Sequence, residues 1–306
     1  MTQAKVPHEA DRQLPLGGEI FLDHIGHFVP DPVAATAALA RAGFAPTPVS
    51  VQSNPDGTPT GTGNVTCMLT RGYVEVLFKT ADTPLAREFD ASIAEYAGVH
   101  LAAFSIAEAE ATHQRLNDAG FAMRQLVQFQ RPVETVSGPD VAAFSVVRLE
   151  RGAMAEGRIQ LLAHRTESTV WQPRWLTHGN GAAALTDLLI VCADVDEAAA
   201  RFARFTGRPA LVTTFGQSIQ LDRGRVEIVT ETAFAALAPE IAVPRLPFMG
   251  AYAIRVASLR DAEELLDRAM LNPRRTGKAL LVPFPAELGI GAWYFAENAD
   301  DLPWRA

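Results

Sequence analysis

A unit of one strand, one helix and three further strand candidates recurs four times along the 306 residues, and it limits the fold more than any other feature of the chain. In the first copy, a β-prone run ends at Val29, Asp31 and Pro32 begin a helix, and Gly43 stops it. The other copies follow the same plan. The four opening runs are Phe21–Val29, Gly98–Ile106, Leu185–Val195 and Gly250–Ser258.

Every copy also ends in a strongly β-prone run. The order β-α-β-β-β, repeated four times, predicts an α+β fold, and a length of 306 residues suits two domains of about 150 residues each. We expect modules 20–80 and 97–165 to form a first domain (20–165), and modules 184–232 and 248–298 a second (184–298). The closing runs are Tyr73–Phe78, Arg158–His164, Arg225–Thr230 and Ala292–Glu297.

Residues 166–183 lie between the two predicted domains and lack the periodicity of a helix or strand. They read as a linker. Trp171 and Trp175 within it indicate that the linker packs against a domain instead of extending into solvent.

Charge and composition exclude several classes of protein. A net charge of -8 and few lysines argue against a nucleic-acid partner, because phosphate binding needs clustered cations. No run approaches the roughly 20 apolar residues that cross a bilayer, and the first residues lack the apolar core of a signal peptide. We therefore expect a cytoplasmic protein without a membrane partner. Cys67 and Cys192 share no motif spacing and read as buried, reduced thiols.

Two familiar catalytic motifs are absent from the sequence. The glycine-rich run 56–63 lacks the Gly-Lys-Ser/Thr ending of a phosphate loop and precedes a strand, so a hairpin or cavity rim suits it better. There is no G-x-S-x-G nucleophile elbow, and neither cysteine has a neighbouring base. Covalent catalysis is disfavoured.

The strand motifs resemble those of the vicinal-oxygen-chelate superfamily, which includes glyoxalases, bleomycin-resistance proteins and extradiol dioxygenases. LDHIGHFV, from Leu22, is similar to the family's opening strand with its metal-binding histidine, and YVEVLF, from Tyr73, to its closing strand with a glutamate. The stretch 61–78 resembles the GTxN…GYLEL signature of the glyoxalase-like subgroup. The resemblance implies two tandem glyoxalase-like domains, each formed by two βαβββ modules around a cavity.

This resemblance also implies a metal site in the first domain, with ligands from the first and last strand of each module. Glu75 could be either a ligand or the catalytic general base that exchanges a proton with a carbon beside a carbonyl. Two imidazoles, a carboxylate and an amide suit a divalent ion such as Fe, Mn, Co, Ni or Zn. The ligands carried over are His24, Glu75, His100 and Gln160, with His164 in reserve.

The predicted substrate-binding residues are Asn64, Arg158 and Phe104. Arg158 has the parity of Gln160 along its strand and is suited to a substrate carboxylate. By the same alternation, His24 shares a face with Gly26 and Phe28, whereas His27 faces the other side of the sheet.

The second domain is expected to be a degenerate copy, because no histidine matches His24 or His100. Its corresponding positions are Asp187, Glu227, Tyr252 and either Trp293 or Tyr294. The two carboxylates could serve as ligands, or could be buried partners of Arg225 or Arg255. Such a copy could serve stability, dimerisation or the shape of the first cavity.

The sequence is compatible with three functions. A metal-dependent lyase or isomerase of the glyoxalase type, acting on a small oxygenated substrate, is favoured. An extradiol-type dioxygenase would use His24, His100 and Glu75 as its triad. A non-catalytic, resistance-type binding protein would fit Gln160, a poorer ligand than glutamate, and the many phenylalanines. In each case the partner is a small molecule, and a homodimer is a further expectation.

Overall fold

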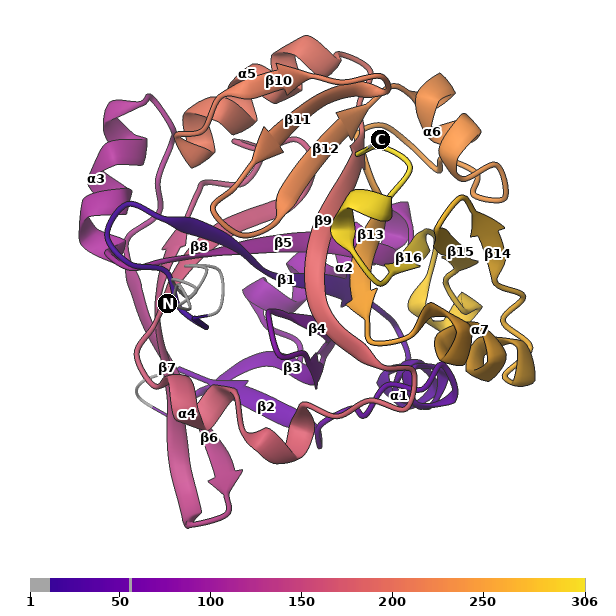
Figure 1. Cartoon of the computed structure of the whole chain (residues 1–306). Coiled ribbons are helices and arrows are strands. Elements are labelled where there is room, and N and C mark those ends of the chain that lie inside the picture. Colours follow the sequence, from indigo (N-terminus) through magenta and orange to yellow (C-terminus); the bar gives the residue numbers. More distant parts are fainter. Residues whose placement is uncertain (1–11, 55–56, 306) are drawn as a thin grey trace, which may run out of the picture.

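The computed structural model describes residues 12–54 and 57–305, which contain two eight-stranded sheets (Figure 1). The strand order of the first is β2-β3-β4-β1-β5-β8-β7-β6. Its strands are β1 (Ile20–Phe28), β2 (Ser50–Ser53), β3 (Pro59–Met68), β4 (Tyr73–Lys79), β5 (Gly98–Ile106), β6 (Val127–Thr135), β7 (Gly138–Arg148) and β8 (Arg158–His164). The helices of this part are α1 (Pro32–Arg41), α2 (Pro84–Glu95) and α3 (Ala109–Asp118).

The second sheet repeats this order as β10-β11-β12-β9-β13-β16-β15-β14, so the predicted α+β fold of two tandem glyoxalase-like units is confirmed. Its strands are β9 (Ala182–Val191), β10 (Ala210–Val212), β11 (Gly216–Gln220), β12 (Arg225–Val229), β13 (Phe248–Val256), β14 (Arg274–Thr276), β15 (Ala279–Pro283) and β16 (Ala292–Ala296). The helices here are α5 (Val195–Thr206), α6 (Glu231–Leu237) and α7 (Leu259–Arg268), with short 3-10 turns η3 (Ala286–Leu288) and η4 (Ala299–Asp301).

The first helix illustrates how local sequence sets the repeated elements. The Asp31 side chain accepts hydrogen bonds from the backbone N–H groups of Val33 and Ala34, both at 3.0 Å, which caps α1. After the helix, Gly43 adopts a φ of +84°, a left-handed conformation that favours glycine and turns the chain toward β2.

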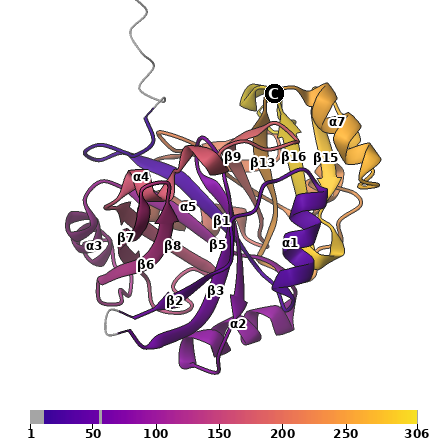
Figure 2. The ribbon, with the colours of Figure 1, turned by 90° about the horizontal axis from the view of Figure 1, so that it is seen from below.

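In the first sheet, the two modules join through the antiparallel pairing of β1 with β5, while β1 pairs with β4 and β5 with β8 in parallel. The sheet curls until its edge strands β2 and β6 come into contact, so that its concave face encloses a cavity (Figure 2). The convex faces of both sheets and the helices share one core, to which α1, α3 and α5 contribute Leu39, Leu116 and Phe202. None of the described helices is long and apolar enough to span a membrane.

The segment between the sheets forms two short helices, α4 (Glu167–Val170) and the 3-10 turn η2 (Pro173–Trp175). Trp171 is buried, with its ring 4.6 Å from that of His164 and 6.1 Å from that of Tyr73. The segment therefore packs against the first sheet, where Trp171 joins an apolar cluster with Tyr73 and Phe144.

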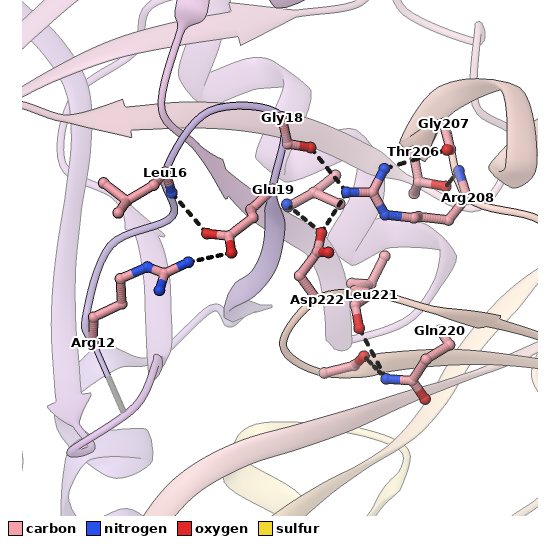
Figure 3. A network of polar contacts seen from close by, with 12 residues as sticks. Arg12, Leu16, Gly18, Glu19, Thr206, Gly207, Arg208, Gln220, Leu221 and Asp222 are labelled. Atoms are coloured by element: carbon pink, nitrogen blue, oxygen red, sulfur yellow. Dashed lines mark hydrogen bonds and ion pairs between the residues drawn. The ribbon is translucent and has the colours of Figure 1, made fainter. Parts of the chain in front are cut away.

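A network of polar contacts ties the start of β1 to the second domain (Figure 3). The Asp222 carboxylate, in the β11–β12 turn, accepts a hydrogen bond from the backbone N–H of Ile20 at 2.8 Å and pairs with Arg208. Arg208 also donates to the carbonyl of Gly18 at 2.8 Å. Because β1 carries predicted site residues, these contacts fix its position from outside the first domain.

His27 is buried between the domains, on the face opposite His24 as expected. Its Nδ1 lies 3.0 Å from the carbonyl of Leu288, and its Nε2 lies 2.9 Å from the hydroxyl of Tyr252. Burial, and to a smaller degree the charge of His100, lowers the pKa of His27 to about 4 despite the contact with the Leu288 carbonyl.

This pKa predicts an acid-sensitive domain contact. The unfolded chain binds a proton at His27 near pH 6.5, whereas the folded chain binds it only near pH 4. The contribution of neutral His27 to the free energy of unfolding is therefore fully present above pH 6.5 and is lost as the pH falls from 6.5 to about 4. The loss amounts to at most about 3 kcal/mol. Urea unfolding between about pH 7 and pH 4 should show a shallower loss for His27→Gln than for the parent. His113→Gln is the control, and identical profiles for all three proteins would contradict the assignment.

Candidate active site in the first domain

A pocket of about 80 Å³ opens on the concave face of the first sheet and is called the smaller pocket. It adjoins a larger pocket of about 230 Å³, with which it shares Arg148, Arg158 and Gln160. Aromatic side chains form much of its wall. The polar residues that line the smaller pocket are His24, Asn64, Glu75, Arg131, Arg148, Arg158 and Gln160.

Strand pairing places several of these residues in one row across the sheet. Tyr73 pairs with His24, His24 with Ala103, Ala103 with Gln160, and Gln160 with Arg148. The row therefore runs over β4, β1, β5, β8 and β7. Because Ala103 has only a methyl side chain, it leaves space between His24 and Gln160.

His24 is held by a buried carboxylate on the preceding residue. Its Nδ1 lies 2.7 Å from Oδ1 of Asp23, whose Oδ2 lies 2.9 Å from Nε2 of His164. Burial opposes the charge on Asp23, but the charges and hydrogen bonds of His164 and His24 outweigh it and hold the pKa of Asp23 well below its usual range. An imidazole whose Nδ1 is bound to a carboxylate has its ring orientation fixed and presents Nε2 to the pocket.

Glu75 faces this free nitrogen. Its Oε1 accepts a hydrogen bond of 2.5 Å from the side-chain amide of Asn64, and its Oε2 lies 3.6 Å from Nε2 of His24. The ring of Tyr73 stacks on the imidazole, with centroids 4.3 Å apart. A separation of 3.6 Å is too long for a hydrogen bond, so the two atoms leave a gap between them that a cation could bridge.

The structure does not bring His100 to the other predicted ligands. His100 lines the larger pocket, where its Nε2 lies 2.7 Å from the carbonyl of Tyr96. Burial lowers the pKa of His100, against the effect of that carbonyl. In the part of the chain that the structure describes, no three His, Cys, Asp or Glu side chains group closely enough to hold a metal ion. A metal centre would therefore need the amide oxygen of Gln160.

A bulge in β5 explains why His100 and Phe104 do not face the smaller pocket, although the sequence predicted that they would. The pairing with β1 passes from Val99 directly to Leu101 and leaves His100 unpaired. Beyond this point the alternation is shifted, so Leu101 and Ala103 face the cavity while Phe104 enters the shared core. The ring of Phe104 lies 5.8 Å from that of Phe205 on α5, away from the pocket that it was predicted to line.

The same register shows which residue takes the place of His24 in the second module. His24 pairs with the first residue of β4, Tyr73, and Leu101 pairs with the first residue of β8, Arg158. Leu101 thus stands where a second histidine was expected.

Residues 22–206, more than half of the chain, match the model of the glyoxalase-like domain family. The chain belongs to this family. No curated protein shows significant sequence similarity to it.

Solved structures resemble this glyoxalase-like chain over most of its length but at low identity, so they show the fold alone. A hypothetical protein from Staphylococcus aureus has a TM-score of 0.61 and 9% identity, over 90% of this chain and 98% of that one. A variant of 4-hydroxymandelate synthase from Streptomyces coelicolor has a TM-score of 0.53 and 12% identity, over 92% and 94%. The Mn(II)-bound glyoxalase from Novosphingobium aromaticivorans has a TM-score of 0.52 and 12% identity, over 94% and 85%.

In the second glyoxalase-like unit, the residues at the corresponding positions are bound by other side chains of the protein or are buried. Asp187 accepts hydrogen bonds from Arg305 at 2.9 and 3.1 Å and from the indole of Trp304 at 3.1 Å, so its partner is Arg305 and not Arg255. Glu227 pairs with Arg225 at 3.1 Å, one of the two arrangements considered from the sequence. Tyr252, Trp293 and Tyr294 are fully buried. These contacts leave the carboxylates engaged within the fold.

Sequence reasoning missed two residues of the first site, Asp23 and Arg148. Asp23 precedes His24 and alternation alone would place it on the other face, but the β1 pairing skips it, and its carboxylate reaches His24 and His164. Arg148 had a signal in the sequence, because it shares the parity of Phe144 and Val146, which both face the cavity.

Replacing Asp23 should therefore destabilise the fold. Asp23→Ala leaves two buried imidazoles without their acceptor, which we expect to cost about 3–5 kcal/mol of unfolding free energy. Chemical denaturation at neutral pH measures this, with the exposed Asp140→Ala as a control that should change little. A cost for Asp23→Ala as small as that of the control would show that the Asp23 bridge does not hold the site.

Proposed function

We propose that the smaller pocket is the active site of a glyoxalase-type lyase or isomerase that acts on a small oxygenated substrate with the help of a divalent metal ion. The observation that carries the proposal is the facing pair of His24 Nε2 and Glu75 Oε2, 3.6 Å apart. Asp23 holds one member and Asn64 the other. Such a preset pair of buried polar groups is costly to maintain, and function accounts for it.

Glu75 would transfer the proton. Its Oε1 is occupied by Asn64, which leaves Oε2 to accept a proton from a substrate carbon beside a carbonyl and to return it elsewhere. The aromatic wall, with Tyr73, Phe89 and Phe144, would limit the water that reaches this carboxylate.

The donor set fits a divalent metal ion of the kind expected. His24 offers Nε2, Glu75 offers a carboxylate oxygen, and Gln160 offers Oε1, which is buried and has no hydrogen-bond partner. One nitrogen and two oxygen donors suit Mn²⁺ and the other first-row ions named above. When bound, the ion would polarise the substrate's oxygen atoms and stabilise an enolate. The glyoxalase of similar fold from Novosphingobium aromaticivorans is Mn(II)-bound, which supports this view.

A non-catalytic small-molecule-binding protein is the second candidate. The aromatic wall and the leucine at position 101 favour it, because they provide an apolar cavity with one ligand fewer. An extradiol-type dioxygenase is not proposed, since its triad would need His100 beside His24 and Glu75.

Metal content separates the candidates. Protein purified after growth with added manganese, iron, cobalt, nickel or zinc should carry about one equivalent of metal per chain by plasma mass spectrometry, because three donors line the same pocket. His24→Ala and Glu75→Gln should lose this metal, whereas His100→Ala should keep it. Metal-free protein after reconstitution would favour the binding protein, and loss in His100→Ala would contradict the ligand set.

Proton transfer can be followed without knowledge of the full reaction. In deuterium oxide, the metal-loaded protein should exchange the C–H of at least one small 2-oxo or 2-hydroxy compound, and Glu75→Gln, measured at saturating metal, should slow this exchange by about 10²–10⁴-fold. Nuclear magnetic resonance of the compound measures the rate. Glu95→Gln, a carboxylate at the mouth of the larger pocket, is the control. Exchange that is unaffected by Glu75→Gln would rule out Glu75 as the base.

A further inference from the structure

The smaller pocket carries more positive charge than its own acids balance. Among the described residues that line it are three arginines, Arg131, Arg148 and Arg158, and one carboxylate, Glu75. Glu75 is already engaged with Asn64 and faces His24. Since a buried charge without a counter-ion is costly, the partner of each guanidinium indicates what the pocket accepts.

The charge of Arg158 is neutralised within the protein. Its Nη2 lies 2.6 Å from Oε2 of Glu88, and its guanidinium lies over the ring of Phe89, 5.1 Å from the centroid. Arg124, at the larger pocket, pairs with the same Glu88 at 3.6 Å and with Glu150 at 3.3 Å. These two glutamates are thus occupied, and Arg158, which the sequence suggested as the carboxylate-binding residue, already has an ion-pair partner.

Within residues 12–54 and 57–305 neither Arg131 nor Arg148 forms an ion pair, and of the two it is Arg148 that pairs across the sheet with Gln160. The Nε of Arg148 is buried without a hydrogen-bond partner. Burial first, and then the charges of Arg158 and Arg124, lower the pKa of Arg148 to about 10. The side chain is therefore still charged at neutral pH, and it lines both pockets.

The position of Arg148 relates this charge to the proposed reacting groups. Arg148 ends the row that runs through Gln160 and Ala103 to His24, over three strand spacings of about 4.8 Å each. If Arg148 binds the anionic group of a ligand, the remaining atoms of that ligand would lie above Ala103. There they would lie between the amide of Gln160 and the pair of His24 and Glu75.

We infer that the smaller pocket binds a small organic carboxylate whose adjacent carbon bears an oxygen, and that Arg148 is the residue that binds its carboxylate. A guanidinium binds a carboxylate through two parallel hydrogen bonds, which fixes orientation as well as position. The inference deepens the proposed function by naming the substrate class. It rests on that function only for the reacting end of the molecule, because binding of the anion requires no metal.

Two pairs of probes of similar size test the charge requirement on metal-free protein. Pyruvate is compared with hydroxyacetone, and lactate with propane-1,2-diol, by isothermal titration calorimetry and by the rise in unfolding temperature. The two anions should bind and the two uncharged compounds should bind at least about tenfold more weakly, because hydrogen bonds to a charged group are among the stronger ones. Inorganic phosphate is included as an anion of different shape.

Variants then test the role of Arg148. Arg148→Met should weaken binding of pyruvate and lactate at least about tenfold, whereas Arg268→Met, on the exposed side of α7, should leave it unchanged. Because the charge of Arg148 has no partner in the free protein, Arg148→Met should unfold at a temperature equal to or above that of the parent. Lost binding is therefore distinguishable from lost folding.

The inference is overturned if the uncharged compounds bind as well as the anions, if Arg148→Met binds them normally, if no anion binds, or if phosphate binds more tightly than both carboxylates. Its failure is separable from that of the proposed function. If pyruvate binds through Arg148 to a protein that holds no metal and catalyses no exchange, the inference is supported and the proposed enzymatic function is rejected. If the protein binds metal and catalyses exchange but binds charged and uncharged compounds equally, the proposed function is supported and the inference is rejected.

Discussion

The antiparallel pairing of β1 with β5 is the constraint on which the first domain depends. It joins two βαβββ modules into one curled sheet and sets which residues face the cavity. Both strands of this pair contain an unpaired residue, Asp23 in β1 and His100 in β5. The first irregularity brings a carboxylate to His24, and the second turns His100 away from it. The content of the site thus follows from two local departures from regular strand pairing.

Much of the architecture can be predicted from the sequence, because strand alternation and helix boundaries are local signals, and a positive-φ glycine ends the helix in three of the four modules. Asp31 and Gly43 act in the structure as their positions indicate. Parity along β1 also correctly separates His24 from His27. Where the strand is regular, the alternation of side chains is a sufficient guide to which face they occupy.

The remainder of the site depends on contacts that the sequence does not encode locally. The bulge at His100 falls between Val99 and Leu101, neither of which is a glycine or proline, and it reverses the predicted face of Phe104. The ion pair of Arg158 depends on Glu88, 70 residues earlier on α2, whereas Arg148 has no ion-pair partner among the described residues. Such pairings are decided by tertiary packing, so alternation and motif likeness alone cannot rank the arginines.

The two domains have diverged in what fills their concave faces. In the first, His24 and Glu75 face an open pocket, whereas in the second the matching Asp187 and Glu227 are bound by Arg305 and Arg225. A site whose carboxylates are engaged by arginines offers no free donor, whereas one with free donors is available to a ligand. This difference is why we propose the first domain as the place of the chemistry.

The most direct test of this account is a crystal structure of the protein grown with Mn²⁺, with anomalous diffraction recorded to locate the ion. The account predicts one anomalous peak per chain within ligand distance of His24 Nε2, a Glu75 oxygen and Gln160 Oε1. A peak at His100 or at Asp187, or the absence of any peak on saturation with metal, would contradict it.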